Sequence, residues 1–458
     1  MKRRCFAAVT ALLMALGLTG CGDTKLKLNL NPQELYALPE LPAQYTALNA
    51  QISALLAEGA EYAAPTSGTR VQSVQMVDLD SDGREEAIAF LRRYEDEKPL
   101  KIYIFKEVDE EYRPAAVIEG SGSAISSINY SDLNSDGRTE LVVGWKVNTE
   151  LQALSVYALR TGSGEELLRP EEVLKSVSYV KYAITDLDQD SLQEVVILRA
   201  DEEGSGLAEY YSWGQSGSLA QSATAVSMTM AELSRQGRLT RGTLNDGTPA
   251  LFITGVTEQS RCITDILTLE KGELDNILLS ASTGVSRVIS DYYGLYPTDI
   301  NADGVTEVPV PVPLPKWSEE GDDYYRVDWM QFGPEGSGQT LLRTYHDMES
   351  RWSFQLPQEW TDAIMVSRTT MSDEAGVTFY RMERDSVPVP FLRISAITGT
   401  NRDIKALRGN RFILSRQMET SYTAELLEGN SRWGETALTP DQVRSAFSII
   451  ATEWTAGD

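Results

Sequence analysis

The 458-residue chain has little histidine, cysteine or positive charge. It contains one His and three Cys, whose positions match no Cys/His zinc motif. Lys and Arg number 41 against 67 Asp and Glu, so the formal net charge is −26 at pH 7. So acidic a chain repels other polyanions, which argues against nucleic acid and anionic lipid headgroups as partners.

Signs of catalysis are also scarce. The chain has no Gly-rich phosphate loop and no Ser or Cys nucleophile motif. Its one histidine, His346, stands beside Asp347 at the point where the composition of the chain changes. We expect His346 to be a structural residue rather than a general base.

Long apolar runs are missing except at the N-terminus. Lys2, Arg3 and Arg4 precede an apolar run at residues 5–18 that is too short to span a bilayer as a helix. The run ends Leu-Thr-Gly before Cys21, which resembles the lipobox of bacterial lipoproteins. The resemblance implies that residues 1–20 are a signal peptide and that Cys21 carries the lipid that holds the protein on a membrane, outside the cytoplasm. A plain secretory signal is the alternative.

The lipid assignment leaves Cys262 as the one cysteine of the mature chain, so no intramolecular disulfide is expected. Cys262 lies in a strand-like segment and is expected to be a buried apolar residue. Residues 21–44 are predicted to be a tether. Residues 45–66 place four Leu and Ile side chains at helical spacing, which predicts an amphipathic helix that packs on the following domain.

One nine-residue motif recurs along the chain. Each copy has oxygen-bearing side chains at positions 1, 3, 5 and 9, a pattern that wraps several hard ligands around one Ca²⁺. Three copies have Gly at position 6, where a sharp turn needs positive φ, and the third copy has Ser191 there. The candidate ligands are Asp78, Asp80, Asp82, Glu86, Asp132, Asn134, Asp136, Glu140, Asp186, Asp188, Asp190, Glu194, Asp299, Asn301, Asp303 and Glu307.

The motif differs from an EF-hand on its C-terminal side. An EF-hand needs a bidentate Glu at position 12, where this chain has only Ala, Val or Ile. Each copy runs instead into a short apolar stretch, so it joins strand to strand. The position-5 residues Asp82, Asp136 and Asp190 are 54 residues apart, and Asp303 follows after 113. A degenerate copy around Asp246 lies midway, with Gly, Leu and Ala at the other ligand positions, so we expect no metal there.

Over residues 70–340 this pattern resembles the FG-GAP/VCBS repeats of integrin-like β-propellers. The resemblance implies a mainly β chain whose loops bind about four Ca²⁺ ions. A period near 54 residues with several strands per repeat also favours propeller blades over helical solenoids. We therefore predict a five-bladed propeller at residues 67–346. Only three strands are found after the last loop, so the segment 70–77 is expected to supply the fourth and close the ring.

Residues 347–458 lack the motif and are predicted to form a small α+β domain. Thr439 and Pro440 open a predicted helix whose apolar stripe would be Val443, Phe447, Ile450 and Trp454. The segment is faintly similar to domains of the PsbP/Mog1 type.

These features favour a cell-surface lipoprotein whose calcium-stabilised propeller acts as a binding or scaffold module for a protein or glycan. The alternatives are a hydrolase or lyase on the same scaffold and a purely structural envelope component. Propeller enzymes that act on anionic substrates generally add basic residues, and the sequence shows no Lys/Arg cluster for that purpose. Fold alone does not decide among these classes.

Overall fold

The computed structural model describes residues 43–109, 111–161, 167–214, 219–316, 318, 320–360, 364–382 and 387–451. The predicted signal peptide, Cys21 and nearly all of the tether lie outside these ranges. The described chain is mainly β, with several antiparallel sheets, none of which closes on itself. Within it, no helix combines the length and apolar character needed to cross a bilayer.

Five sheets repeat one plan: a four-stranded antiparallel meander, with a candidate metal loop or its degenerate copy before or within its first hairpin. We call them repeat sheets 1 to 5. Sheet 1 contains β2 (Val74–Val77), β3 (Glu86–Arg92), β4 (Leu100–Val108) and β5 (Glu111–Gly120), with β1 (Glu61–Tyr62) also beside β3; sheet 2 contains β6 (Ala124–Ser131), β7 (Glu140–Lys146), β8 (Gln152–Thr161) and β9 (Leu168–Tyr179); sheet 3 contains β10 (Lys181–Thr185), β11 (Glu194–Ala200), β12 (Gly206–Trp213) and β13 (Leu219–Ala225).

Sheets 4 and 5 carry additions to this plan. In sheet 4 a short helix precedes the first strand, and in sheet 5 the first strand is reduced to a bridge between Thr298 and Glu307. Sheet 4 follows α3 (Met230–Gln236) and contains β14 (Arg238–Thr243), β15 (Pro249–Val256), β16 (Arg261–Glu270), β17 (Glu273–Asn276) and β18 (Val288–Asp291); sheet 5 contains β19 (Val308–Pro313), β20 (Tyr325–Phe332), β21 (Gly338–Asp347), β22 (Trp352–Gln355) and β28 (Phe447–Ile449).

The repeat sheets pack face to face in one row, because the strand after each loop is apolar on both sides. On β7, Leu141 and Val143 join the core shared with sheet 1, whereas Val142 joins the core shared with sheet 3. Alternate side chains of a strand point to opposite faces, so a continuous apolar run fills two cores at once. Comparable cores join sheets 3 and 4 and sheets 4 and 5.

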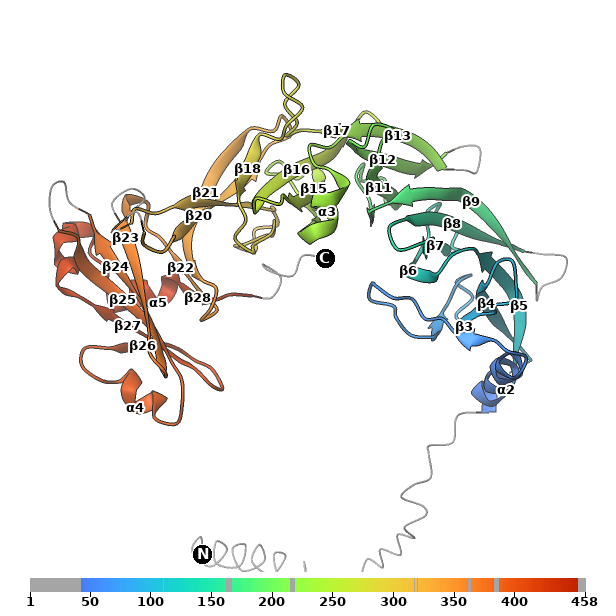
Figure 1. The fold of residues 1–458 in the computed structure, drawn as a ribbon, viewed down its shortest axis with the longest axis horizontal. Helices are drawn as coiled ribbons and strands as arrows, with labels where there is room; N and C mark the ends of the chain where they lie inside the picture. Colours follow the sequence, from blue (N-terminus) through green and yellow to red (C-terminus); the bar gives the residue numbers. More distant parts are fainter. Residues whose placement is uncertain are drawn as a thin grey trace, which may run out of the picture.

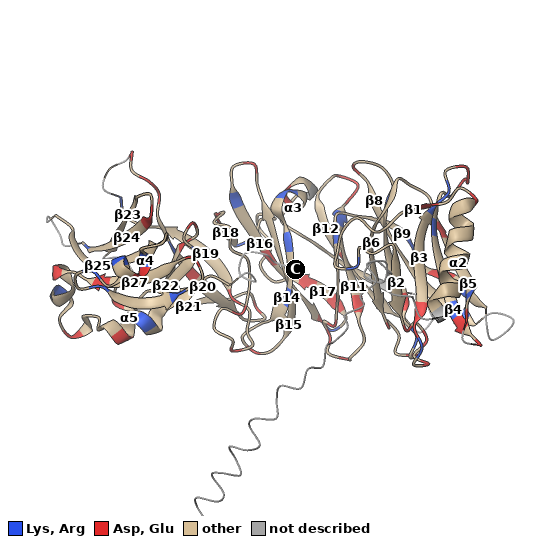
Figure 2. Ribbon diagram, turned by 90° about the horizontal axis from the view of Figure 1, so that it is seen from below, with Lys and Arg blue, Asp and Glu red and all other residues tan. Residues whose placement is uncertain are grey.

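The row bends into an open arc instead of a ring (Figure 1), and a view turned by 90° shows the sheets side by side (Figure 2). The predicted ring closure is wrong. The segment 70–77 supplies β2, which pairs with β3 from Val74↔Ala89 to Val77↔Glu86. The loop between these strands is too short for β2 to reach any sheet but the first. The fourth strand of sheet 5 is β22 instead.

Both ends of the arc are covered by other elements. At one end, helix α2 (Ala43–Ala57) buries Leu48 and Ile52 against Ala87, Ala89 and Tyr112 of sheet 1. The sequence predicted a helical segment at residues 45–66, and the helix ends nine residues before the end of that segment. At the other end a further sheet packs on sheet 5, with the strand order β23 (Ile364–Thr370), β24 (Glu374–Arg381), β25 (Val389–Ile397), β27 (Ser421–Leu426) and β26 (Phe412–Arg416). Covered terminal faces remove the need to close the ring.

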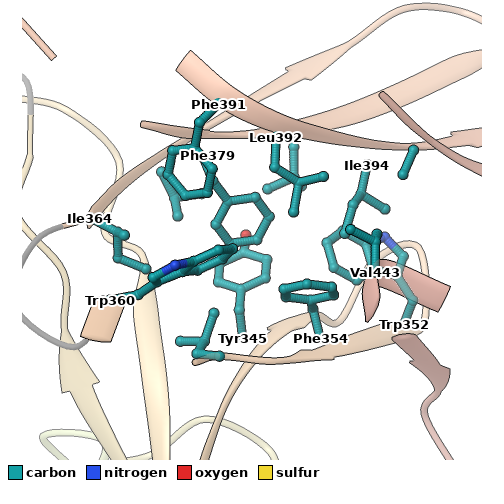
Figure 3. Packing of buried hydrophobic residues seen from close by; sticks show 14 of the residues in the cluster. Tyr345, Trp352, Phe354, Trp360, Ile364, Phe379, Phe391, Leu392, Ile394 and Val443 are labelled. Atoms are coloured by element: carbon teal, nitrogen blue, oxygen red, sulfur yellow. The ribbon is translucent and has the colours of Figure 1, made fainter. Parts of the chain in front are cut away.

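An aromatic core joins sheet 5 to this C-terminal sheet (Figure 3). Tyr345 and Phe354 of sheet 5 point toward Phe379 of the C-terminal sheet, whereas Trp352 lies beside Val443. The hydrogen-bonded sheet also continues past residue 346, because β22 and β28 both belong to it. The expected domain boundary thus falls inside a continuous sheet and core.

The C-terminal segment also contains α4 (Arg402–Ala406), α5 (Pro440–Ala446) and the 3₁₀ turns η1 (Gln358–Trp360) and η2 (Glu428–Thr436). Thr439 caps α5 in a capping box, as its sequence predicts. The predicted helical stripe is wrong beyond Val443, because the chain turns at Phe447 into β28 and pairs with β22. Trp454 lies outside the described residues.

We predict that Phe354→Ala lowers the free energy of unfolding by about 3–5 kcal/mol, because it opens a cavity in this core. Phe354 is fully buried, with its ring centroid 6.0 Å from that of Trp360 and 5.8 Å from that of Phe379. Denaturant unfolding measures the effect, with Met418→Ala at a 90% exposed position as the control. A loss no larger than that of the control would contradict the packing.

Candidate metal loops and an inner groove

Four of the five loops share one backbone conformation around their ligand positions. We number them loop 1 (78–86), loop 2 (132–140), loop 3 (186–194), loop 4 (242–250) and loop 5 (299–307). In loops 1, 2, 3 and 5, positions 4 and 6 both have positive φ. Ser191 of loop 3 adopts φ 72° where the other loops have Gly, so the missing Gly does not change the turn.

A buried glutamate holds each of the same four loops together. The side chain at position 9 is at most 2% exposed, and its Oε2 accepts a hydrogen bond from the backbone N–H of position 2. The bond ties the start of the loop to the start of the next strand. The four bonds are Leu79 to Glu86 at 2.8 Å, Leu133 to Glu140 at 2.9 Å, Leu187 to Glu194 at 3.0 Å and Ile300 to Glu307 at 3.0 Å.

Loops 1 and 3 bring their carboxylates into tight groups. Asp186, Asp188, Asp190 and Glu194 each place an oxygen within 4.8 Å of the others, as do Asp78, Asp80 and Glu86 of loop 1. These groups could hold a metal ion. In loop 1, Oδ1 of Asp78 and Asp80 and Oε1 of Glu86 are buried and accept no hydrogen bond. Buried carboxylate oxygens without donors are costly, and a cation would satisfy them.

Loops 2 and 5 have an amide at position 3. The Asn134 Nδ2 donates to Oε1 of Glu140 at 3.2 Å, and the Asn301 Nδ2 donates to Oδ2 of Asp303 at 2.9 Å. Asp132 and Asp299 each accept the N–H of the position-6 Gly through Oδ2. The predicted ligands of each loop therefore lie on one turn.

Burial makes the position-9 glutamates hard to ionise. It raises the pKa of Glu86, Glu140 and Glu194 to about 7, with neighbouring loop carboxylates adding to the shift, and it raises the pKa of Glu307 in the same way. A bound cation or a proton is therefore needed to offset the negative charge of these loops.

The residue across the sheet from the position-9 Glu differs among the loops. Extending the strand registers by one pair places Lys106, Ala158, Ser212 and Gln331 there in sheets 1, 2, 3 and 5. The Lys106 ammonium forms ion pairs with Asp80 and, at 3.5 Å, with Asp82. Loop 1 thus has a cation of its own that competes with a metal ion.

Loop 4 keeps the turn without the ligands. Gly247 has positive φ, and Asp246 accepts the N–H of Thr248 at 3.0 Å, as position 5 does in the other loops. At position 3 the side chain of Leu244 is buried in the core between sheets 4 and 5.

Adjacent loops are joined by backbone hydrogen bonds. The N–H of Thr139 in loop 2 donates to the carbonyl of Leu79 in loop 1 at 2.8 Å, and that of Thr306 in loop 5 donates to Thr243 in loop 4 at 3.0 Å. These bonds tie loop 1 to loop 2 and loop 4 to loop 5.

His346 and Cys262, the chain's possible general base and nucleophile, are both buried. His346 is 1% exposed, its Nε2 lies 2.8 Å from the Thr344 hydroxyl, and burial lowers its pKa to about 3. Cys262 lies on β16, where burial raises the pKa of its thiol to about 11. Neither environment activates a base or a nucleophile.

A groove of about 900 Å³ lies along the first strands of sheets 2, 3 and 4. We call it the inner groove. Tyr182 is held in it by Ser127 at 2.9 Å and Asn129 at 2.7 Å, and the Tyr179 hydroxyl donates to Gln152 at 3.0 Å. The lining consists mainly of hydroxyl, amide and aromatic groups.

Sequence reasoning missed the basic side chains of this groove. Lys146, Lys181 and Arg241 line it, although they lie far apart along the chain. No local pattern marks them, because the three residues come from three different sheets.

Comparison with known proteins does not assign the chain to a family. No family model and no curated protein matches it. Among solved structures, AofleA from Arthrobotrys oligospora matches with a TM-score of 0.25 and 8% identity over 73% of this chain and 89% of that one. A triple arginine-to-alanine mutant of AofleA gives a TM-score of 0.27 and 7% identity over the same shares. Likeness this weak does not define the fold.

We predict that Lys106→Ala tightens calcium binding at loop 1 about tenfold, a gain of about 1.4 kcal/mol, because it removes the competing ammonium. Calorimetric titration measures calcium binding at loop 1 in a protein whose other three loops are disabled by Asp136→Asn, Asp190→Asn and Asp303→Asn. Lys98→Ala, which removes an exposed lysine outside the loop, is the matched control. Equal or weaker binding after Lys106→Ala would show that the ammonium does not oppose the ion.

Proposed function

We propose that this protein is a lipid-anchored binding module of the cell surface, in which Ca²⁺ ions stiffen an open arc of propeller-like blades. The observation that carries the proposal is the recurrence of one oxygen-rich loop in four sheets, each with a buried glutamate hydrogen-bonded across the turn. Such a repeated arrangement exceeds what a hairpin needs in order to turn.

The repeat sheets support the blade interpretation. Each has antiparallel strands in sequence order, and each packs its faces on the next sheet through an apolar core. That is how blades pack in a propeller of the FG-GAP/VCBS type. In this proposal the arc replaces a closed ring, because α2 and the C-terminal sheet cover its two ends.

Calcium is the ion that best fits the loops. Their donors are carboxylate and amide oxygens, which hard cations prefer, and no nitrogen or sulfur ligand belongs to the motif. Ca²⁺ accepts six to eight oxygens in flexible geometry, which suits ligands spread over a nine-residue turn. Two positive charges per ion would also offset carboxylates that burial makes hard to ionise.

The anchor and the binding role rest on separate features. The lipobox-like sequence before Cys21 supports a lipid anchor, and the acidic composition disfavours nucleic acid as a partner. The inner groove supports ligand binding, because its polar and aromatic groups converge along a surface of three successive sheets. A protein or a glycan would occupy it.

We predict that calcium raises the melting temperature of the protein and that chelator reverses the rise, because an ion that binds only the folded state stabilises it. At a calcium concentration 100 times Kd, each site adds about 2.7 kcal/mol. Asp190→Asn should reduce the shift, whereas Asp246→Asn at the same position of loop 4 should leave it unchanged. Scanning calorimetry with and without chelator measures both, and a melting temperature indifferent to calcium would refute the proposal.

Lipid anchoring is tested independently of calcium. Replacement of Cys21 by Ser should move the protein from the membrane fraction to the soluble fraction, because it removes the thiol that carries the lipid. Cys262→Ser is the matched control and should stay with the membranes. Unchanged membrane association of the Cys21→Ser protein would exclude this anchor.

A further inference from the structure

The inner groove differs in charge from the rest of the molecule. The whole chain has a net charge of −26, yet the described residues that line the groove include Lys146, Lys181 and Arg241 and no Asp or Glu. The groove therefore repels anions less than the rest of this acidic surface does, and its basic side chains attract them.

Lys181 lines the inner groove, and Arg238 lies near it outside the lining. Lys181 is half-buried on β10, and within the described chain no carboxylate pairs with it. Burial lowers its pKa, and the nearby guanidinium of Arg238 lowers it further. The ammonium of Lys181 thus lines the groove under the influence of a second positive charge, and an anion in the groove would offset both.

Arg238 is held in place without being neutralised. Its Cζ lies 5.2 Å from the ring centroid of Tyr296, and its Nε is buried and donates no hydrogen bond. Arg238 therefore adds a positive charge near Lys181, and this charge favours an anion in the groove.

The neutral part of the groove narrows the class of ligand. The rings of Tyr179 and Tyr182 meet edge to face at 5.3 Å, and their hydroxyls lie among Ser127, Asn129 and Gln152. Hydroxyl and amide groups beside aromatic rings match sugar rings, which have apolar faces and many hydroxyls. An open groove of about 900 Å³ takes several such rings in a row.

We propose that the inner groove binds an acidic oligosaccharide, with its carboxylate or phosphate group at Lys181 and its sugar rings along Tyr179 and Tyr182. This inference rests on the proposed function, because it names the ligand class of the binding module. A sparsely charged glycan suits the site, whereas a dense polyanion would be repelled by the surrounding acidic surface.

The test is calorimetric binding to the full chain in detergent with calcium present. The probes are a hyaluronan oligosaccharide, which has a carboxylate on every second ring, its methyl ester, a neutral-sugar oligosaccharide that carries one phosphate, and poly-glutamate. We expect the hyaluronan oligosaccharide or the phosphorylated oligosaccharide to bind, which tells carboxylate from phosphate as the recognised group. The methyl ester and poly-glutamate should bind at least tenfold more weakly. Binding should also weaken with added salt.

Variants locate the site. Lys181→Gln should weaken binding at least tenfold, Lys181→Arg should restore most of it, and Lys175→Gln at an exposed position of β9 should have no effect. An unchanged melting temperature shows that each variant is folded. The proposal is overturned if neither acidic glycan binds, if the ester or poly-glutamate binds equally well, or if Lys181→Gln has no effect. A calcium-dependent melting temperature with no glycan binding would overturn this inference but not the proposal that the loops bind calcium.

Discussion

The structure depends on a buried carboxylate at the end of four of the five candidate metal loops. The position-9 glutamate enters the sheet with almost no exposure and accepts the N–H of position 2, so it sets both the turn and the register of the following strand. Its burial is costly as long as its charge is not offset. A proton or a cation offsets that charge, and the proposed calcium ions would act on the arc at this point.

The arc follows from the strands that leave these loops. Each is apolar on both faces, so every repeat sheet must pack against a neighbour on each side. A ring would satisfy the outermost faces, but α2 and the C-terminal sheet cover them instead. The inner groove lies on the first strands of sheets 2 to 4, where an open arc keeps it accessible.

The sequence predicted the local features well and the distant ones poorly. The loop residues and the apolar strands after them carry short-range signals, and the structure places both as expected. The segment 70–77 was assigned to the wrong sheet because nothing local distinguishes pairing with β3 from pairing across a ring. Phe447 was placed in a helix because helical spacing there coincides with a strand that only β22 stabilises. The basic residues of the inner groove were not predicted, because they come from three different sheets.

The most direct test of the account is a crystal structure of the protein grown with calcium, with anomalous data collected at long wavelength. The account predicts one anomalous peak in each of loops 1, 2, 3 and 5, within ligand distance of the position-9 glutamate, and none beside Asp246 in loop 4. Calcium-replete crystals without peaks in these loops would contradict it, and the buried carboxylates would then have to be protonated features of the turn.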